Sequence, residues 1–270
     1  MNLLYACNDA FFKGIVLSTL SIAKHTSSVL NIYVLTIDLH DVNPKYIPVK
    51  EEKRIALEQE LKKYNPDSTV TVIDVREQYI ELFKGSNVEK NKYSPYAFLR
   101  LLSCDVDILP DKVLYIDSDI LALKDIKELY DIDITNYDYA MCKDQVGKWF
   151  LNYNMCNSGV VLINMKRVKE NKIFKLCQNY ILTHHSQMPD QDALNICSDS
   201  LLIIDQKYNE QIKIKPDTVL FHFNQKSYFF PYIHFKNIKQ WEIDRVHKEY
   251  KIFDFDDLYE IYLPLKDKFE

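Results

Sequence analysis

Short hydrophobic runs alternate along the first half of the chain with longer segments of helical character. The runs at residues 3–6, 31–37 (NIYVLTI) and 69–75 (TVTVIDV) are mainly apolar, as is typical of strands covered on both faces of a parallel sheet. Residues 13–25 repeat apolar side chains at helical spacing, and residues 50–64 are rich in strong helix formers. This alternation predicts an α/β fold with a mostly parallel, Rossmann-like sheet flanked by helices.

The second half continues the same alternation. Four runs, VLYI, YDYAMC, GVVLINM and LLIID, predict strands, and MKRVKENKIFKLCQNYILTHH predicts a single amphipathic helix. Pro95 is placed to begin a helix, YAFLRLLSCDV, whereas residues 83–95 hold turn formers without periodicity and predict a loop. No linker rich in Pro, Gly or Ser divides the chain. We therefore expect one domain over residues 1–270, with residues 230–270 as a C-terminal extension packed on or beside it.

Composition and charge narrow the choice of partners and location. Hydrophobic residues make up 47% of the 270 positions, which suffices for a large core, and the net charge of -5 is spread along the chain. A basic surface for nucleic acid is therefore not expected. Six scattered cysteines without a CxxC pair argue against a disulfide framework or a zinc ribbon and favour a reducing cytoplasm. No signal peptide and no run of about 18 apolar residues is present, so we expect at most a peripheral contact with the inner face of the membrane.

Glycine is scarce in this chain. Only Gly14, Gly85, Gly147 and Gly159 occur, so neither a GxGxxG turn nor a GxxxxGK[ST] phosphate loop can be written. If the protein binds a phosphate, it must use groups other than a glycine-rich loop.

Two carboxylates, Asp117 and Asp119, follow the predicted strand VLYI directly. Ligands of open α/β sheets gather at the carboxyl ends of strands, and alternation would turn both side chains to one side if the extended conformation continued through Ser118. Two such charges repel unless a cation lies beside them, and oxygen ligands suit Mg²⁺ or Mn²⁺. The pattern alone fits a turn or a helix cap as well as a metal site.

Five segments, in order, resemble the family 8 glycosyltransferases, which are retaining enzymes that include bacterial lipopolysaccharide galactosyltransferases and glucosyltransferases and glycogenin. KVLYIDSDIL resembles the DxD segment of that family, and YACNDAFF resembles its uridine-binding segment. The other three matches are FLRL, NSGVVLIN and PDQDALN, so that the resemblance covers about residues 1–223. It implies a GT-A-type fold and transfer of a hexose from UDP-glucose or UDP-galactose to a glycan or glycolipid acceptor.

The resemblance also implies roles for individual residues. The metal ligands for Mn²⁺ (or Mg²⁺) would be Asp117, Asp119 and His222. The nucleotide would be bound by Ala6, Asn8, Phe11, Asp117, Ser118 and Lys226. The donor sugar would be bound by Arg100, Asn157, Asp190, Gln191 and Asp192, among which Gln191 and Asp190 are the catalytic candidates nearest the anomeric carbon. Whether retention proceeds by double displacement or by a front-side route stays open at this point.

Each of these positions also has a purely structural interpretation. His222 and Phe11 fit packed core residues, Arg100 fits a salt bridge on a helix surface, and Asp190 and Asp192 fit acidic residues of a helix N-terminus. Asp192 fits either a sugar contact or an ion pair with Arg100.

The chain departs from the family at its tail. The family pattern there is H-x-x-G-x-x-K-P-W, whereas this chain reads HFNQKSYFFPY, without a glycine. Either Lys226 reaches the phosphate through a shortened loop, or that contact is lost. Residues 83–95 and 143–156 are predicted lids, in which the residues suited to stacking on sugars are Tyr93, Trp149, Phe150 and Tyr153.

Two other functions fit parts of the pattern. Haloacid-dehalogenase-like phosphatases also place DxD after a hydrophobic strand, although theirs is DxDx[TV] near the N-terminus. A protein that binds UDP-sugars without turnover would fit Asn8, where the family often has Asp, and the altered tail.

Overall fold

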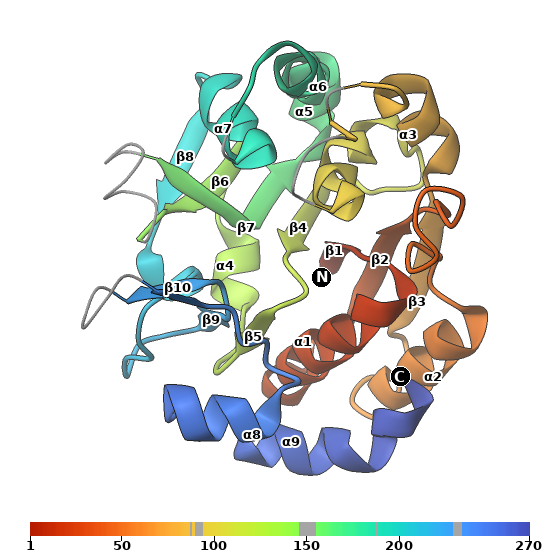
Figure 1. Ribbon diagram of the computed structural model, residues 1–270. Coiled ribbons are helices and arrows are strands. Elements are labelled where there is room, and N and C mark those ends of the chain that lie inside the picture. Colours follow the sequence, from red (N-terminus) through yellow and green to blue (C-terminus); the bar gives the residue numbers. More distant parts are fainter. Residues whose placement is uncertain (87, 90–93, 146–154, 187, 229–233) are drawn as a thin grey trace.

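A seven-stranded sheet forms the centre of the computed structural model, which describes residues 1–86, 88–89, 94–145, 155–186, 188–228 and 234–270 (Figure 1). The strand order is β3-β2-β1-β4-β7-β6-β8. The strands are β1 (Asn2–Ala6), β2 (Asn31–Thr36), β3 (Thr69–Asp74), β4 (Lys112–Ile116), β6 (Tyr139–Lys143), β7 (Cys156–Asn164) and β8 (Leu201–Ile204). Only β7 runs antiparallel to its neighbours, β4 and β6. The predicted mostly parallel sheet is confirmed.

Successive side chains of each strand point to opposite faces of the sheet, so both faces are apolar. Helices cover both faces and form two cores with them. Leu3 and Leu114 belong to the core on the α1 side, whereas Leu4 and Val113 belong to the core on the other side. The elements of the first part are α1 (Phe12–His25), α2 (Glu51–Leu61), α3 (Arg76–Phe83), the 3₁₀ helix η2 (Pro95–Asp105) and α4 (Lys127–Asp131). Those of the second part are α5 (Met165–Glu170), α6 (Ile173–Thr183), α7 (Pro189–Ile196) and the short 3₁₀ helix η4 (Gln206–Tyr208).

One helical prediction needs correction, one is confirmed, and one helix was not predicted. The long helix predicted after the strand GVVLINM is divided into α5 and α6, because Lys172 adopts a left-handed conformation with φ of 55°. The helix predicted to begin at Pro95 is confirmed, and it is a 3₁₀ helix. Helix α3 was not predicted, since it has eight residues and buries only Tyr79 and Phe83.

Two small ribbons and a helical C-terminal segment complete the fold. Strand β5 (Ile120–Ala122) pairs with β9 (Leu220–His222), and β10 (Lys226–Tyr228) pairs with β11 (His234–Lys236). The C-terminal helical elements are α8 (Ile243–Arg245), the π-helical turn η5 (Val246–Tyr250), α9 (Asp256–Tyr262) and the 3₁₀ helix η6 (Leu263–Lys268). They lie along α1, where Phe269 packs near Phe12.

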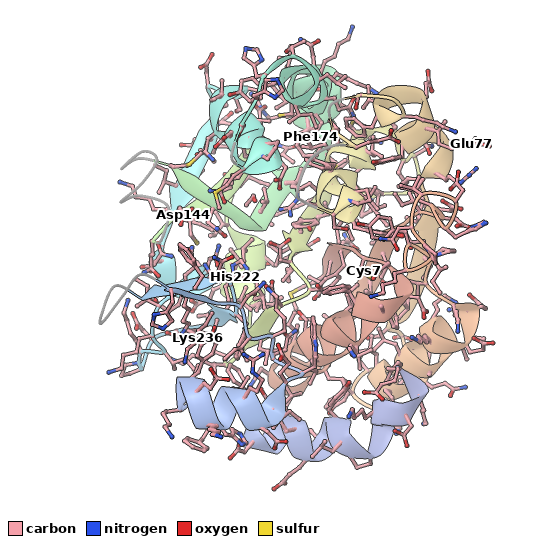
Figure 2. The ribbon with its side chains drawn as sticks, viewed as in Figure 1. Cys7, Glu77, Asp144, Phe174, His222 and Lys236 are labelled. Carbon is pink, nitrogen blue, oxygen red and sulfur yellow. The ribbon has the colours of Figure 1, made fainter. Side chains whose placement is uncertain are left out.

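The C-terminal helical elements share the core on the α1 side of the sheet, and side chains fill the space between these layers (Figure 2). The division of the chain into one domain with an extension stays a prediction. Within the described ranges, we find no helix with the length and apolar character needed to cross a bilayer.

Candidate active site

A turn and a ribbon bring the three predicted metal ligands together. Strand β4 ends at Ile116, and the chain turns over residues 117–119, where the Ile120 amide donates to the Asp117 carbonyl at 3.2 Å. The extended conformation does not continue through Ser118, so strand alternation is not what brings the two carboxylates together. The register of β5 with β9 pairs Ile120 with His222 instead. Ligand atoms of Asp117, Asp119 and His222, the metal-ligand cluster, lie within 4.8 Å of one another.

The His222 ring is held in one orientation. Its Nε2 lies 3.1 Å from Asp119 Oδ1 and 4.0 Å from Asp117 Oδ2, while its Nδ1 lies 3.2 Å from the Asn209 amide oxygen. Since an amide oxygen only accepts, Nδ1 donates to Asn209, and Nε2 is the ring nitrogen that faces the two carboxylates. A Cβ at position 159 would lie 2.5 Å from His222 Cε1, so Gly159 leaves room for the ring. His222 is thus buried, as the structural interpretation required, but it also faces the acids.

Lys239 supplies the positive charge beside this cluster. Its ammonium lies 2.5 Å from Asp119 Oδ2. Although burial opposes ionisation, the charges of Lys239 and His222 hold the pKa of Asp119 well below its usual value. Lys239 is not among the site residues predicted from the sequence. Its signal was present, because Lys239, Gln240 and Trp241 preserve the K-x-W of the family tail, displaced along the chain by the β10–β11 ribbon.

Arg100 is buried at 5% exposure and links two carboxylates, so the alternative interpretation as a salt bridge on a helix surface does not hold. Its guanidinium lies 2.9 Å from Asp117 Oδ1 and 3.4 Å from Asp190 Oδ2, and it also donates to the Ser158 carbonyl. The Tyr115 ring lies 4.1 Å from the guanidinium carbon. Burial opposes the charged form, but the surrounding acids raise the pKa of Arg100, which stays ionised.

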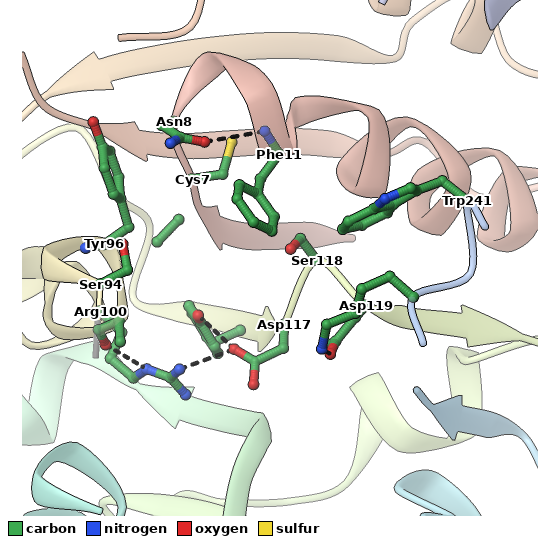
Figure 3. A pocket seen from close by; sticks show the side chains of 14 residues that line it. Cys7, Asn8, Phe11, Ser94, Tyr96, Arg100, Asp117, Ser118, Asp119 and Trp241 are labelled. Atoms are coloured by element: carbon green, nitrogen blue, oxygen red, sulfur yellow. Dashed lines mark hydrogen bonds and ion pairs between the residues drawn. The ribbon is translucent and has the colours of Figure 1, made fainter. Parts of the chain in front are cut away.

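A cavity of about 230 Å³ opens beside the cluster (Figure 3). Seven predicted site residues line it: Ala6, Asn8, Phe11, Arg100, Asp117, Ser118 and Asp119. Phe11 is 48% exposed, so it is not a core residue, and it meets Trp241 edge-on at 5.6 Å. The Asn8 amide is already engaged: its oxygen accepts from the Phe11 amide at 3.0 Å and its nitrogen donates to the Lys45 carbonyl at 3.2 Å. Asn8 therefore shapes the loop that leads into α1.

Three of the remaining sugar-site candidates, Asn157, Asp190 and Gln191, form a buried network next to Arg100 and are not among the residues that line the cavity. The Gln191 amide oxygen accepts from Asn157 Nδ2 at 3.1 Å and from the Ser158 amide at 3.2 Å. The Gln191 amide nitrogen donates to Asp144 Oδ2 at 2.8 Å, which fixes the orientation of the amide. Burial raises the pKa of the adjacent Asp190, while Arg100 acts against the rise. We call Asn157, Ser158, Asp190 and Gln191, with Asp144, the α7 network.

Two predicted residues lie elsewhere. Lys226 is not among the residues that line the cavity; its ammonium donates to the Ile212 carbonyl at 3.1 Å and lies 4.4 Å from the Tyr250 ring centre. Asp192 is half-buried and accepts from the Ser186 hydroxyl, whereas the acids that pair with Arg100 are Asp117 and Asp190. The predicted lid residues Tyr93, Trp149, Phe150 and Tyr153 lie outside the described residues.

Comparison with known proteins identifies the family. The model of glycosyl transferase family 8 matches residues 2–244. The chain belongs to glycosyltransferase family 8. A putative glycosyltransferase of Haemophilus influenzae is 28% identical over 222 residues, which is 77% of this chain and 63% of that protein. General stress protein A of Bacillus subtilis is 27% identical over 195 residues, covering 64% of this chain and 65% of that protein. The chain thus spans less than two thirds of the length of these two relatives.

Solved structures support the fold of this family 8 member. An active-site mutant of LgtC superposes with a TM-score of 0.71 at 18% identity, covering 96% of this chain and 94% of that one. The galactosyltransferase LgtC in complex with donor and acceptor sugar analogs gives a TM-score of 0.68, also at 18% identity and with the same coverage. The GT-A-type fold and the family resemblance are confirmed. Membership of this family does not favour the haloacid-dehalogenase-like alternative.

Proposed function

We propose that this protein is a metal-dependent retaining glycosyltransferase that moves a glucosyl or galactosyl group from a UDP-sugar to a hydroxyl of a glycan or glycolipid. The observation that carries this proposal is the convergence of Asp117, Asp119 and His222 beside a cavity that also holds Arg100 and an exposed aromatic ring. Family membership and the likeness to LgtC support it.

The residues of the cluster suit a divalent ion. Two carboxylates and one neutral imidazole are ligands that Mn²⁺ accepts, and Mg²⁺ accepts the carboxylates. Asn209 fixes the tautomer that leaves Nε2 free to coordinate, a common arrangement around ligating histidines. A divalent ion held by these residues would supply positive charge that stabilises a departing diphosphate. The glycine-poor chain has no phosphate loop to serve this purpose.

The side chains of the cavity suggest how the donor is oriented. Phe11 and Trp241 offer aromatic surface for the uracil and ribose, with Ala6 and the loop shaped by Asn8 beside them. Lys239 and Ser118 lie next to the metal-ligand cluster, where the diphosphate would bind, and Lys239 takes the role first predicted for Lys226.

The sugar end of the donor would then face Arg100 and the α7 network. Arg100 is held by two acids and is therefore positioned before the donor arrives. In the transfer, the acceptor oxygen bonds to the anomeric carbon, the bond from that carbon to UDP breaks with its electron pair leaving on the β-phosphate oxygen, and the hydroxyl proton passes to that departing diphosphate. Since the Gln191 oxygen already accepts two hydrogen bonds, it is a poor nucleophile, which favours a front-side route. Asp190 and Gln191 then orient the sugar, and Asn157 holds Gln191.

We assign this activity to the cytoplasm, with a peripheral contact at the inner face of the membrane. The six cysteines are free in the structure, which agrees with a reducing compartment.

A ligand screen tests the proposal. The protein is melted with UDP, UDP-glucose and UDP-galactose, each with Mn²⁺ and with EDTA, and UDP release is then measured with the sugars that stabilise it. We expect Mn²⁺ and one UDP-sugar together to raise Tm, because only the folded state binds them. The absence of any Mn²⁺-dependent stabilisation would refute the proposal. Stabilisation without UDP release or transfer to any acceptor would instead identify a binding protein.

A further inference from the structure

We propose that Lys239 couples metal binding to nucleotide binding, so that the nucleotide-free site binds a bare divalent ion weakly and accepts ion and UDP together. This inference rests on the proposed function and adds the state of the site that receives the ligand.

The ammonium of Lys239 already neutralises one metal ligand. It lies 2.5 Å from Asp119 Oδ2, the carboxylate whose other oxygen is 3.1 Å from His222 Nε2. A cation bound between Asp119 and His222 would therefore lie within a few ångströms of the ammonium. Since Asp119 is only 9% exposed, water screens the repulsion between these two positive charges poorly. Lys239 thus opposes binding of the ion until a negative group compensates for the charge.

The chain around Lys239 is anchored independently of this contact. The Gln240 side chain is fully buried and donates to the Ser118 carbonyl at 2.6 Å. The Trp241 ring lies against Phe11 and over Gly14, where a Cβ would be 2.7 Å from the ring. Lys239 lines the cavity directly before these two anchored residues. A rotation of its flexible stem is enough to transfer the ammonium from Asp119 to a diphosphate oxygen, and the backbone can stay in place.

Opposite effects on the two ligands distinguish this role from a structural one. Without Lys239, the ammonium no longer repels the bare ion, so the ion binds more tightly. The same substitution removes a positive charge that would attract the diphosphate, so UDP binds less tightly when metal is present. By linkage, UDP strengthens metal binding by the same factor as metal strengthens UDP binding. Removal of Lys239 therefore reduces this factor. Loss of a structural contact would weaken both ligands together.

The test measures Mn²⁺ affinity directly, from the electron paramagnetic resonance signal of free Mn²⁺, with and without UDP. The variants are Lys239→Met, Lys239→Arg and the control Lys175→Met, which makes the same charge change at an exposed ion pair with Asp105. For wild type, we expect UDP to tighten Mn²⁺ binding at least about 10-fold, within the usual range of coupling. Lys239→Met should bind bare Mn²⁺ about 10-fold more tightly and lose most of the coupling. Lys239→Arg and Lys175→Met should behave as wild type.

The failures of the two proposals are distinguishable. If wild type binds no Mn²⁺ even with UDP, and does not differ from Asp119→Asn, the proposed function fails. If wild type binds Mn²⁺ with UDP but Lys239→Met binds the bare ion no more tightly than wild type, only the coupling by Lys239 fails. Circular dichroism and thermal melting of each variant verify that it is folded.

Discussion

The two halves of the candidate site differ in how completely the protein satisfies their polar groups. In the α7 network, Gln191 forms hydrogen bonds through both amide atoms, and its partner Asn157 is buried. The metal-ligand cluster instead places two carboxylates and an imidazole nitrogen around a common point at the cavity, with Lys239 supplying a compensating charge. The polar groups of the α7 network are hydrogen-bonded within the protein, whereas the metal-ligand cluster keeps groups that can bind a ligand. Arg100 joins them through Asp190 and Asp117.

The largest effect on activity should come from removing a charge from the metal-ligand cluster. Asp117→Asn keeps the shape of the side chain but removes one negative metal ligand. We expect UDP-sugar turnover with Mn²⁺ to fall at least about 100-fold, beyond the roughly 10- to 100-fold effect of residues that only support ligands. Initial rates of UDP release measure this. Asp67→Asn, at an exposed position, is the control. Full activity of Asp117→Asn in metal-free buffer would contradict the metal role.

Removing the link between the halves should affect stability. Arg100→Ala leaves Asp117 and the buried Asp190 without their shared cation, and breaking a buried pair from one side costs about 3 to 5 kcal/mol of unfolding free energy. Urea denaturation in EDTA measures it. Lys175→Ala, which breaks an exposed pair with Asp105, should cost at most about 1 kcal/mol. Equal losses in the two variants would show that Arg100 is not the central link.

A smaller effect should follow from loosening the histidine. Asn209→Ala removes the acceptor of the His222 Nδ1 proton and leaves all three metal ligands in place. Mn²⁺ affinity in the presence of UDP should fall about 10- to 100-fold, as is usual when the partner of a ligating histidine is lost. The resonance titration described above measures it. Asn171→Ala is the matched control, because it removes a hydrogen bond from a side-chain amide to Asp138. An unchanged affinity in Asn209→Ala would mean that the ring needs no such support.

The smallest effect is expected at Lys226. The Lys226 ammonium donates a hydrogen bond to the Ile212 carbonyl, and Lys226 is not among the residues that line the cavity. Lys226→Ala should therefore change the affinity for UDP with Mn²⁺ by less than about twofold. This lies within the roughly ±0.5 kcal/mol usual for substitutions away from a site. Isothermal titration calorimetry compares it with Lys239→Ala. A tenfold loss confined to Lys226→Ala would restore the role that the sequence predicted for it.

The sheet could be predicted because strands buried on both faces appear in the sequence as continuous apolar runs, and such runs can be recognised from neighbouring residues alone. The sequence also placed Asp117 and Asp119 at a strand end. It did not predict how they meet His222, since the pairing of β5 with β9 joins residues about a hundred positions apart. Asn209 and Asp144 were missed for a different reason: a single polar residue outside a motif gives no local signal. The break at Lys172 was missed because no glycine or proline marks it.

Gly14 shows how a residue without a side chain can limit a site. An added Cβ would lie 2.6 Å from the Ser118 carbonyl and 2.7 Å from Trp241, so even alanine would push the first turn of α1 away from the carboxylate turn. In a saturation library selected for turnover, position 14 would therefore tolerate almost no replacement. An observer who ranked positions by chemical function alone would overlook it.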